Sequence, residues 1–240
     1  MKRLVIIPAF NEGQTIARVI RGIQELLTDL DIVVINDGST DETSVAASTT
    51  GVKVINLPFN MGVGAAMRAG FLFAHENNYD AAIQFDGDGQ HSPADIPVIF
   101  DGLARTNIVI GNRFHAKGSY SISKSRLVAI KILSFIVSRL VNTKITDPTS
   151  GCRSADKSAI TFFSRYYPNE YLNDTIASVV LAHKSGLSIS EHSVTMQGRQ
   201  GGEPSQSQVR AIFHLIRTTL VIFIIAIRKP VYVKPGLEKK

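Results

Sequence analysis

Short apolar runs that each end at a cluster of polar residues and glycine constrain this chain more than any other feature. Leu4–Ile7 stops at Pro8, while Asp31–Ile35 and Ala81–Phe85 are followed by stretches rich in Asp, Asn and Gly. Runs this short, bounded by turn residues, are typical of buried strands in a parallel sheet. Amphipathic segments separate them, and strands alternating with helices at this spacing predict βαβ units with right-handed crossovers. We therefore expect an α/β fold built on a parallel sheet.

The helices are predicted from the spacing of apolar residues. In Thr15–Leu27 these recur three and four positions apart and so share one face of a helix. The remaining expected elements are a strand at Val52–Leu57 and helices at Ser44–Ser48, Gly64–Asn77, Asp95–Ala104 and Leu127–Val141. A chain of 240 residues is long enough for one large domain or two smaller ones. Its composition, with 44% hydrophobic and 19% charged residues, excludes a disordered chain.

The positive charge is concentrated at one end of the chain. The net charge is +6, and residues 209–240 carry seven basic residues against one acid, so residues 1–208 are neutral. A nucleic-acid-binding protein usually spreads positive charge over its binding face, so we expect no nucleic-acid partner. A basic tail beside an apolar segment is instead typical of attraction to an anionic membrane surface. The single cysteine, Cys152, gives no indication of an oxidising compartment. The first apolar run is too short for a secretion signal.

Two segments are both apolar and basic. Residues 117–144 hold six basic residues and no acid, and the helix expected at Leu127–Val141 either packs in the ordinary way or lies on a membrane. A helix at Val209–Ile227 would be about 28 Å long, but Arg210 and Arg217 leave an uninterrupted apolar run of only ten residues. We expect this second helix to be interfacial or partly inserted, with a buried dimer helix as the alternative and a full membrane span as the least favoured.

Polar residues follow the first, second and fourth expected strands, at Pro8–Glu12, Asn36–Ser39 and Asp86–His91. Ligands of open parallel sheets bind where loops leave the carboxyl ends of the strands, so the three loops are expected at one edge. Taken singly, Asn11 could be a helix cap and Asp37 a turn residue. Capping and turn formation do not explain why all three loops share that edge.

Asp86 and Asp88 are the most informative pair in these loops. Two carboxylates separated by one residue repel each other unless a cation lies between them. Oxygen ligands suit Mg²⁺ or Mn²⁺, which also bind phosphate oxygens and water, so the pair predicts a metal site for a nucleoside diphosphate. The glycines of Asn60–Met67 do not form a dinucleotide-binding motif, because Met67 occupies the third glycine position. Close packing of a helix on the sheet explains them, with Arg68 turned toward a phosphate.

These motifs occur in the order found in family 2 glycosyltransferases. The chain resembles the branch of that family that contains dolichol-phosphate mannosyltransferase and bacterial polyprenyl-phosphate glycosyltransferases, and the resemblance runs from residue 4 to about residue 204. The motifs that carry it are Pro8–Glu12, Asn36–Asp41, Asn60–Gly64, Asp86–Gln90, Gly111–Arg113, Asp147–Arg153 and Gln197–Gly202.

The resemblance implies a GT-A fold, which has a mostly parallel central sheet with helices on both faces. It also implies a UDP-, GDP- or dTDP-linked sugar as donor, Mg²⁺ or Mn²⁺ as cofactor, and inversion at the anomeric carbon by direct displacement. Residues 1–208 would form the catalytic domain, and residues 209–240 an amphipathic tail that binds the membrane or dimerises. Carried over by position, the donor would be held by Pro8, Phe10, Glu12, Asp37, Asp86 and Arg68, and the metal by Asp86, Asp88 and Gln90, with Asp88 essential for catalysis.

The resemblance leaves two acceptors open. A polyprenyl phosphate, our first choice, is already ionised and needs cations, for which Arg113, Arg126 and Arg199 are the candidates. A sugar hydroxyl on a lipid-linked or cell-surface glycan needs a general base, for which Asp174 or Glu170 is the candidate. Either acid could instead cap a helix.

Members of this family that use lipid phosphates often carry two transmembrane helices after the catalytic domain, whereas this chain has a half-apolar tail. We expect the protein at the cytoplasmic face of a membrane, peripheral or partly inserted, and keep a small membrane partner and a homodimer open. A sugar-1-phosphate nucleotidyltransferase would carry a glycine-rich basic loop at Pro8–Glu12, and a non-catalytic membrane adaptor would have lost the carboxylates of Asp86 and Asp88. Both alternatives are therefore disfavoured.

Overall fold

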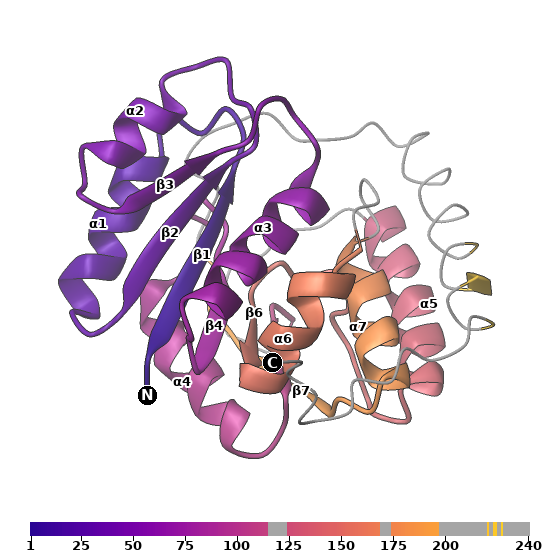
Figure 1. Ribbon diagram of the computed structural model, residues 1–240. Helices are drawn as coiled ribbons and strands as arrows, with labels where there is room; N and C mark the ends of the chain where they lie inside the picture. Colours follow the sequence, from indigo (N-terminus) through magenta and orange to yellow (C-terminus); the bar gives the residue numbers. More distant parts are fainter. Residues whose placement is uncertain (115–123, 169–173, 197–219, 221–222, 225–226, 228–240) are drawn as a thin grey trace.

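The computed structural model describes residues 1–114, 124–168 and 174–196, together with residues 220, 223, 224 and 227 (Figure 1). Within these residues seven strands form one sheet in the order β3-β2-β1-β4-β6-β5-β7. The strands are β1 (Arg3–Ala9), β2 (Asp31–Asn36), β3 (Lys53–Asn56), β4 (Ala81–Gln84), β5 (Ile108–Asn112), β6 (Arg153–Asp156) and β7 (Ile189–Ser193). The helices are α1 (Ile16–Leu26), α2 (Thr43–Ser48), α3 (Val63–Glu76), α4 (Ile96–Asp101), α5 (Lys124–Leu140), α6 (Lys157–Tyr166) and α7 (Asp174–Lys184).

The first four strands form the parallel half of the sheet that the sequence predicts. β1 pairs in parallel with β2 and β4, and β2 pairs in parallel with β3. In this register Ala9 lies opposite Asn36, and Ile6 lies opposite Gln84. The carboxyl ends of β1, β2 and β4 therefore meet at one edge, as expected for the three polar loops.

The second half of the sheet differs, because β6 runs antiparallel to both of its neighbours, β4 and β5, while β7 is parallel to β5. The sheet is thus mostly parallel, as expected for a GT-A fold, and β6 is its antiparallel strand. The sequence of β6, Arg-Ser-Ala-Asp, has no apolar run, and tertiary contacts rather than local pattern bury Arg153, Ser154 and Ala155.

Helices cover both faces of the sheet, so alternate residues of each central strand enter two separate cores. Leu4 and Ile6 of β1 belong to the core covered by α3, α5, α6 and α7. Val5 and Ile7 belong to the other core, which is covered by α1, α2 and α4 (Figure 1). A strand buried on both faces must be apolar throughout, which explains why β1 reads as a continuous apolar run.

The predicted helices are close to the observed ones, with one exception. α1 and α3 begin and end within one residue of the expected bounds. The expected helix Asp95–Ala104 is instead a 3₁₀ turn at Pro93–Asp95, the short helix α4, and a second 3₁₀ turn at Gly102–Ala104. α5 starts three residues earlier than expected, at Lys124.

α5 lies beside α7, buries one side and leaves the other exposed. It buries Ile130, Leu133 and Val137, while Ile132 and Phe135 are exposed by 44% and 64%. In the described part of the chain, no helix combines the length and the hydropathy needed to cross a bilayer.

Most of the predicted tail lies outside the described residues. Its four described positions are helical and exposed, namely Leu220, Phe223, Ile224 and Ile227. The expected helix at Val209–Ile227 and the division of the chain at residue 208 therefore stay predictions.

Candidate active site

The loops after β1 and β2 are joined by side-chain hydrogen bonds into one unit. The Oδ1 atom of Asn11 accepts a hydrogen bond from the backbone N of Thr40 at 3.0 Å, so Asn11 binds the neighbouring loop. The backbone N of Glu12 donates to Oγ1 of Thr43 at 2.8 Å. Asn11 adopts a φ of 54°, a left-handed conformation that asparagine tolerates better than most residues.

Asp37, a predicted donor-binding residue, is buried at the end of β2. Its two carboxylate oxygens accept hydrogen bonds from the backbone N atoms of Met61 and Gly62, each at 2.8 Å. Its neighbour Gly38 has a φ of 67°, and a Cβ there would lie 2.4 Å from the carbonyl carbon of Phe59. Asp37 thus fixes the loop that leads into α3, and its contact with a nucleoside stays a prediction.

Three other predicted donor residues, Pro8, Phe10 and Glu12, lie at the end of β1 and in the loop that follows it. Phe10 is 43% exposed, Pro8 is half-buried, and Oγ1 of Thr15 donates to the Glu12 carboxylate at 3.0 Å. The same hydroxyl lies 2.9 Å from the carbonyl O of Gly87, which joins the loop after β1 to the loop after β4. Arg68 lies in the second turn of α3 and is half-buried.

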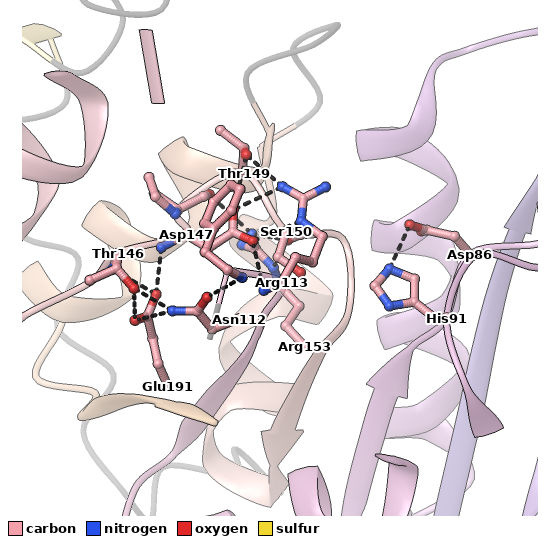
Figure 2. A network of polar contacts seen from close by, with 12 residues as sticks. Asp86, His91, Asn112, Arg113, Thr146, Asp147, Thr149, Ser150, Arg153 and Glu191 are labelled. Atoms are coloured by element: carbon pink, nitrogen blue, oxygen red, sulfur yellow. Dashed lines mark hydrogen bonds and ion pairs between the residues drawn. The ribbon is translucent and has the colours of Figure 1, made fainter. Parts of the chain in front are cut away.

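Asp86 follows β4 and is surrounded by three segments of the chain. Nε2 of Gln84 lies 3.5 Å from Oδ1 of Asp86. Figure 2 shows His91, whose Nε2 lies 3.5 Å from Oδ2 of Asp86. Gly151 approaches so closely that a Cβ there would lie 2.6 Å from Oδ2 of Asp86. Two residues along, Oδ1 of Asp88 accepts from the backbone N of Gln90 at 2.9 Å.

Asp86 is held in its ionised form. Burial opposes ionisation, but the hydrogen bond from His91 and the nearby guanidinium of Arg113 outweigh it and hold the pKa of Asp86 below its usual range. A carboxylate that stays charged at neutral pH can hold a cation.

The donor set fits a divalent cation that is shared with a substrate. Asp86, Asp88 and Gln90 offer oxygen ligands on one loop, and no group of three or more His, Cys, Asp or Glu among the described residues could hold a metal ion alone. Mg²⁺ usually takes one or two carboxylates together with substrate phosphates and water. Near Asp86, the buried atoms Oε1 of Gln84 and Nδ1 of His91 have no hydrogen-bond partner in the described structure.

Arg113, a predicted phosphate-binding residue, is fixed at the end of β5 by an aspartate that is fully buried. Its Nε lies 2.7 Å from Oδ2 of Asp147, and its Nη2 lies 2.8 Å from Oδ1. Oγ1 of Thr149 accepts a further hydrogen bond from Nη2 at 2.7 Å. The structure thus brings Arg113 to the site near Asp86 and shows a carboxylate partner that the sequence does not reveal (Figure 2).

Asp174, a predicted base, is the first residue of α7 and is only 2% exposed. Burial raises the pKa of its carboxyl, although the charge of Arg153 acts in the opposite direction. The hydroxyl of Tyr167 lies 3.4 Å from Oδ2 of Asp174. Its place at the start of a helix agrees with the capping alternative, and its role as a base stays a prediction.

Three other predicted residues are not located. Glu170 and Arg199 lie outside the described residues, and only the backbone of Arg126 is described, in the first turn of α5. Met196, three residues before Arg199, forms a backbone bridge with His91.

Four residues of the site are not predicted from the sequence. They are His91, Asp147, Arg153 and Glu191. His91 directly follows the Asp86–Gln90 motif, and Asp147 and Arg153 are the two ends of another motif, so their positions carried a signal. Arg153 is 2% exposed and donates to the carbonyl O atoms of Ser150 and Pro148 at 3.1 and 3.3 Å.

Comparison with known proteins agrees with this architecture. The model of the family described as glycosyl transferase family 2 matches residues 4–163. UDP-N-acetylglucosamine–dolichyl-phosphate N-acetylglucosaminyltransferase of Methanococcus voltae is 30% identical over 207 residues, which cover 78% of this chain and 82% of that protein. Undecaprenyl-phosphate mannosyltransferase of Micrococcus luteus is 28% identical over 161 residues, which cover 64% of this chain and 66% of that protein.

Solved structures show the same fold. Glucosyl-3-phosphoglycerate synthase of Mycobacterium tuberculosis, solved with Mn²⁺, UDP and glucosyl-3-phosphoglycerate, superposes with a TM-score of 0.71 at 17% identity. The superposition covers 98% of this chain and 82% of the synthase. With the family model spanning residues 4–163, the chain belongs to glycosyl transferase family 2 and is a glycosyltransferase with a GT-A fold.

Proposed function

We propose that the chain transfers one sugar from a nucleoside-diphosphate donor to a polyprenyl phosphate, at the cytoplasmic surface of a membrane and with inversion at the anomeric carbon. The proposal is supported by the names of two relatives, which act on dolichyl phosphate and undecaprenyl phosphate. The observation that carries it is the position of Arg113, a fixed cation close enough to lower the pKa of the carboxylate of Asp86.

We assign the binding of the donor diphosphate and its metal ion to the loop after β4. Asp86 and Asp88, with Gln90, would hold Mg²⁺ or Mn²⁺ on the donor diphosphate. When bound, the cation stabilises the negative charge that develops on the leaving nucleoside diphosphate. The ionised state of Asp86 supports this assignment, and the Mn²⁺ and UDP in the synthase structure support it by analogy.

We assign the binding of the acceptor phosphate to basic residues. A phosphate oxygen of the lipid attacks the anomeric carbon, a new carbon–oxygen bond forms, and the bond to the diphosphate oxygen breaks with its electron pair leaving on the diphosphate. No base is needed, because the phosphate is already ionised. Arg113 is suited to hold it, since a guanidinium binds phosphate in a planar fork, and Arg126 and Arg199 stay candidates for the same task.

The exposed side of α5 supports a location on a membrane. Val128, Ile132 and Phe135 are exposed on it by 57%, 44% and 64%. Lys131 is exposed on the same helix, and the guanidinium of Arg139 lies 5.5 Å from the ring centroid of Phe135. Exposed apolar side chains mixed with cations are typical of helices that lie in the interface of an anionic bilayer.

A melting-shift screen tests the donor side directly. UDP-, GDP- and dTDP-linked sugars are each added to the full chain with Mn²⁺, with Mg²⁺ or with EDTA. We expect one nucleotide class to raise Tm only when a metal is present, because ligands that bind the folded state alone stabilise it. Asp88→Ala should abolish this shift, while Asp101→Ala, an exposed aspartate on α4, should keep it.

Transfer to a sugar hydroxyl is the second candidate, and one observation favours it. The raised pKa of Asp174 suits a group that accepts a proton during the reaction. In that case Asp174→Asn would abolish transfer without changing donor binding, and a glycan rather than a lipid phosphate would receive the sugar.

A further inference from the structure

The carboxylate of Glu191, on β7, fixes the loop that precedes β6. Its Oε1 atom accepts hydrogen bonds from the backbone N atoms of Thr146 and Asp147, at 2.8 and 2.7 Å. Its Oε2 atom accepts from Oγ1 of Thr146 at 2.9 Å and from Nδ2 of Asn112 at 3.0 Å. One side chain therefore ties this loop to β5 and to β7 (Figure 2).

The loop is held from its other side by α5. Oγ of Ser134 donates to the carbonyl O of Ile145 at 2.6 Å, and the backbone N of Ile145 donates to Oγ of Ser138 at 2.9 Å. Each residue from 145 to 147 thus has at least one fixed backbone group. Such a network leaves the backbone of Asp147 little freedom to move.

Asp147 in turn fixes the position of Arg113 through hydrogen bonds. Besides the fork of two hydrogen bonds from the guanidinium, Oδ2 of Asp147 accepts from the backbone N of Arg113 at 3.1 Å. A fork fixes the plane of the guanidinium as well as its position. In Figure 2 Asp147 and Thr149 contact one edge of the guanidinium, and its other edge faces the side on which Asp86 and His91 lie.

We propose that Glu191 and Asp147 are positioning residues for Arg113. Glu191 places the backbone of Asp147, and Asp147 orients the guanidinium before a ligand arrives. A phosphate that binds Arg113 then needs no further ordering of a long side chain, and preorganisation of this kind increases affinity. This inference rests on the proposed function, because the ligand it concerns is the phosphate of the acceptor.

The test compares two binding constants on the full chain. The first is Kd for farnesyl phosphate, with farnesol as the blank, and the second is Kd for UDP in the presence of Mn²⁺. We expect Glu191→Gln and Asp147→Asn to weaken farnesyl phosphate binding about tenfold. Binding of UDP with Mn²⁺ should stay within about twofold of the native protein, since neither residue contacts the loop of Asp86–Gln90.

The matched control is Asp156→Asn. Asp156 also accepts a backbone hydrogen bond, from Ala159 at 2.8 Å, and one from the side chain of Asn107 at 2.7 Å, but it lies at the start of α6. Its loss should leave both binding constants unchanged. If Asp147→Asn does not fold, Glu191→Gln decides the test, because Glu191 is half-buried and its hydrogen bonds go to Asn112, Thr146 and the backbone of Asp147.

A double-mutant cycle separates positioning from stability. In an Arg113→Lys background, Glu191→Gln should weaken farnesyl phosphate binding no further, because lysine cannot form the fork. The proposal is overturned if Glu191→Gln binds farnesyl phosphate as the native protein does, or if it weakens the binding of farnesyl phosphate and of UDP equally. It is also overturned if Glu191→Gln and Arg113→Lys weaken farnesyl phosphate binding additively. A native protein that binds UDP with Mn²⁺ but not farnesyl phosphate would overturn the proposed acceptor instead.

Discussion

At the scale of single residues, two of the aspartates predicted for the site have surroundings that shift their pKa values in opposite directions. Burial opposes the ionisation of both, but His91 and Arg113 keep the pKa of Asp86 low, while the pKa of Asp174 is raised. Carboxyl groups whose environments separate their pKa values in this way are suited to different tasks. A low pKa suits Asp86 to the predicted task of holding a cation, and a raised pKa suits Asp174 to the predicted task of exchanging a proton.

The raised pKa of Asp174 predicts a specific dependence of stability on pH. From the ordinary aspartate pKa of about 4 up to the raised value, the folded protein binds a proton that the unfolded chain releases. The contribution of Asp174 to stability is therefore fully present below about pH 4 and is lost as the pH rises through the raised pKa. Asp174→Asn removes this loss, so its Tm relative to the native protein should increase from pH 4 to pH 7.

Thermal unfolding at a series of pH values measures the effect. Asp101→Asn reports what the loss of an exposed carboxylate does on its own. A Tm difference between Asp174→Asn and the native protein that stays flat over this range would show that Asp174 does not carry the raised pKa.

At the scale of elements, α3 rests on β1 through a glycine. A Cβ at Gly70 would lie 2.4 Å from Cγ2 of Ile6, a side chain that is fully buried. We expect Gly70→Ala to cost about 1–3 kcal/mol of the free energy of unfolding, because an added methyl group overpacks the core. Denaturation by urea measures this cost.

The control is a second helical glycine with space around it. The nearest atom to a Cβ at Gly22 of α1 is Cγ of Pro93, 3.9 Å away. Gly22→Ala should stabilise the protein by about 0.5–1 kcal/mol, because alanine loses less backbone entropy in a helix than glycine does. Equal effects at the two positions would contradict the close packing of α3 on β1.

The exposed side of α5 predicts a measurable affinity for membranes. Phe135→Glu replaces a 64% exposed apolar ring by a negative charge, and should reduce flotation with vesicles of anionic lipid while leaving Tm unchanged. Val98→Glu, a 47% exposed residue of α4, is the matched control and should float as the native protein does. A native level of flotation for Phe135→Glu would exclude this side of α5 as the membrane contact.

At the scale of the whole molecule, the charge is divided between a neutral body and a basic tail. Each basic residue near an anionic surface contributes about 1 kcal/mol, and residues 209–240 have an excess of six. Deletion of residues 209–240 should therefore move the protein from the membrane pellet to the soluble fraction. If the shortened protein stays in the pellet, the tail is not the main anchor and α5 is the next candidate.

Much of the fold follows from local pattern. Apolar spacing is enough for α1 and α3, since each buries one face, and four-residue apolar runs are enough for strands buried on both faces. The antiparallel β6 could not be predicted in this way, because its buried residues include Arg153 and Ser154. Its burial depends on contacts that form only once the chain has folded.

The candidate site, too, could be predicted from the sequence only in part. The shared edge of the loops after β1, β2 and β4 follows from parallel strands, and the structure confirms it. The pairing of Arg113 with Asp147, 34 residues away, and of Glu191 with Thr146, 45 residues away, depends on side-chain geometry between distant segments. No spacing rule contains that information, so the network around Arg113 is visible only in the structure.

The most direct measurement of the central claim is the transfer of labelled sugar into lipid. The full chain is incubated with a labelled UDP-, GDP- or dTDP-sugar, vesicles that contain undecaprenyl phosphate, and Mn²⁺ or Mg²⁺, and the lipid is then extracted into organic solvent. We predict that label from one donor enters the lipid only when metal is present, and that Asp88→Asn lowers the rate by roughly 100-fold or more, as loss of a group that stabilises developing charge does. The account is contradicted if no donor labels the lipid, or if EDTA and Asp88→Asn leave the labelling unchanged.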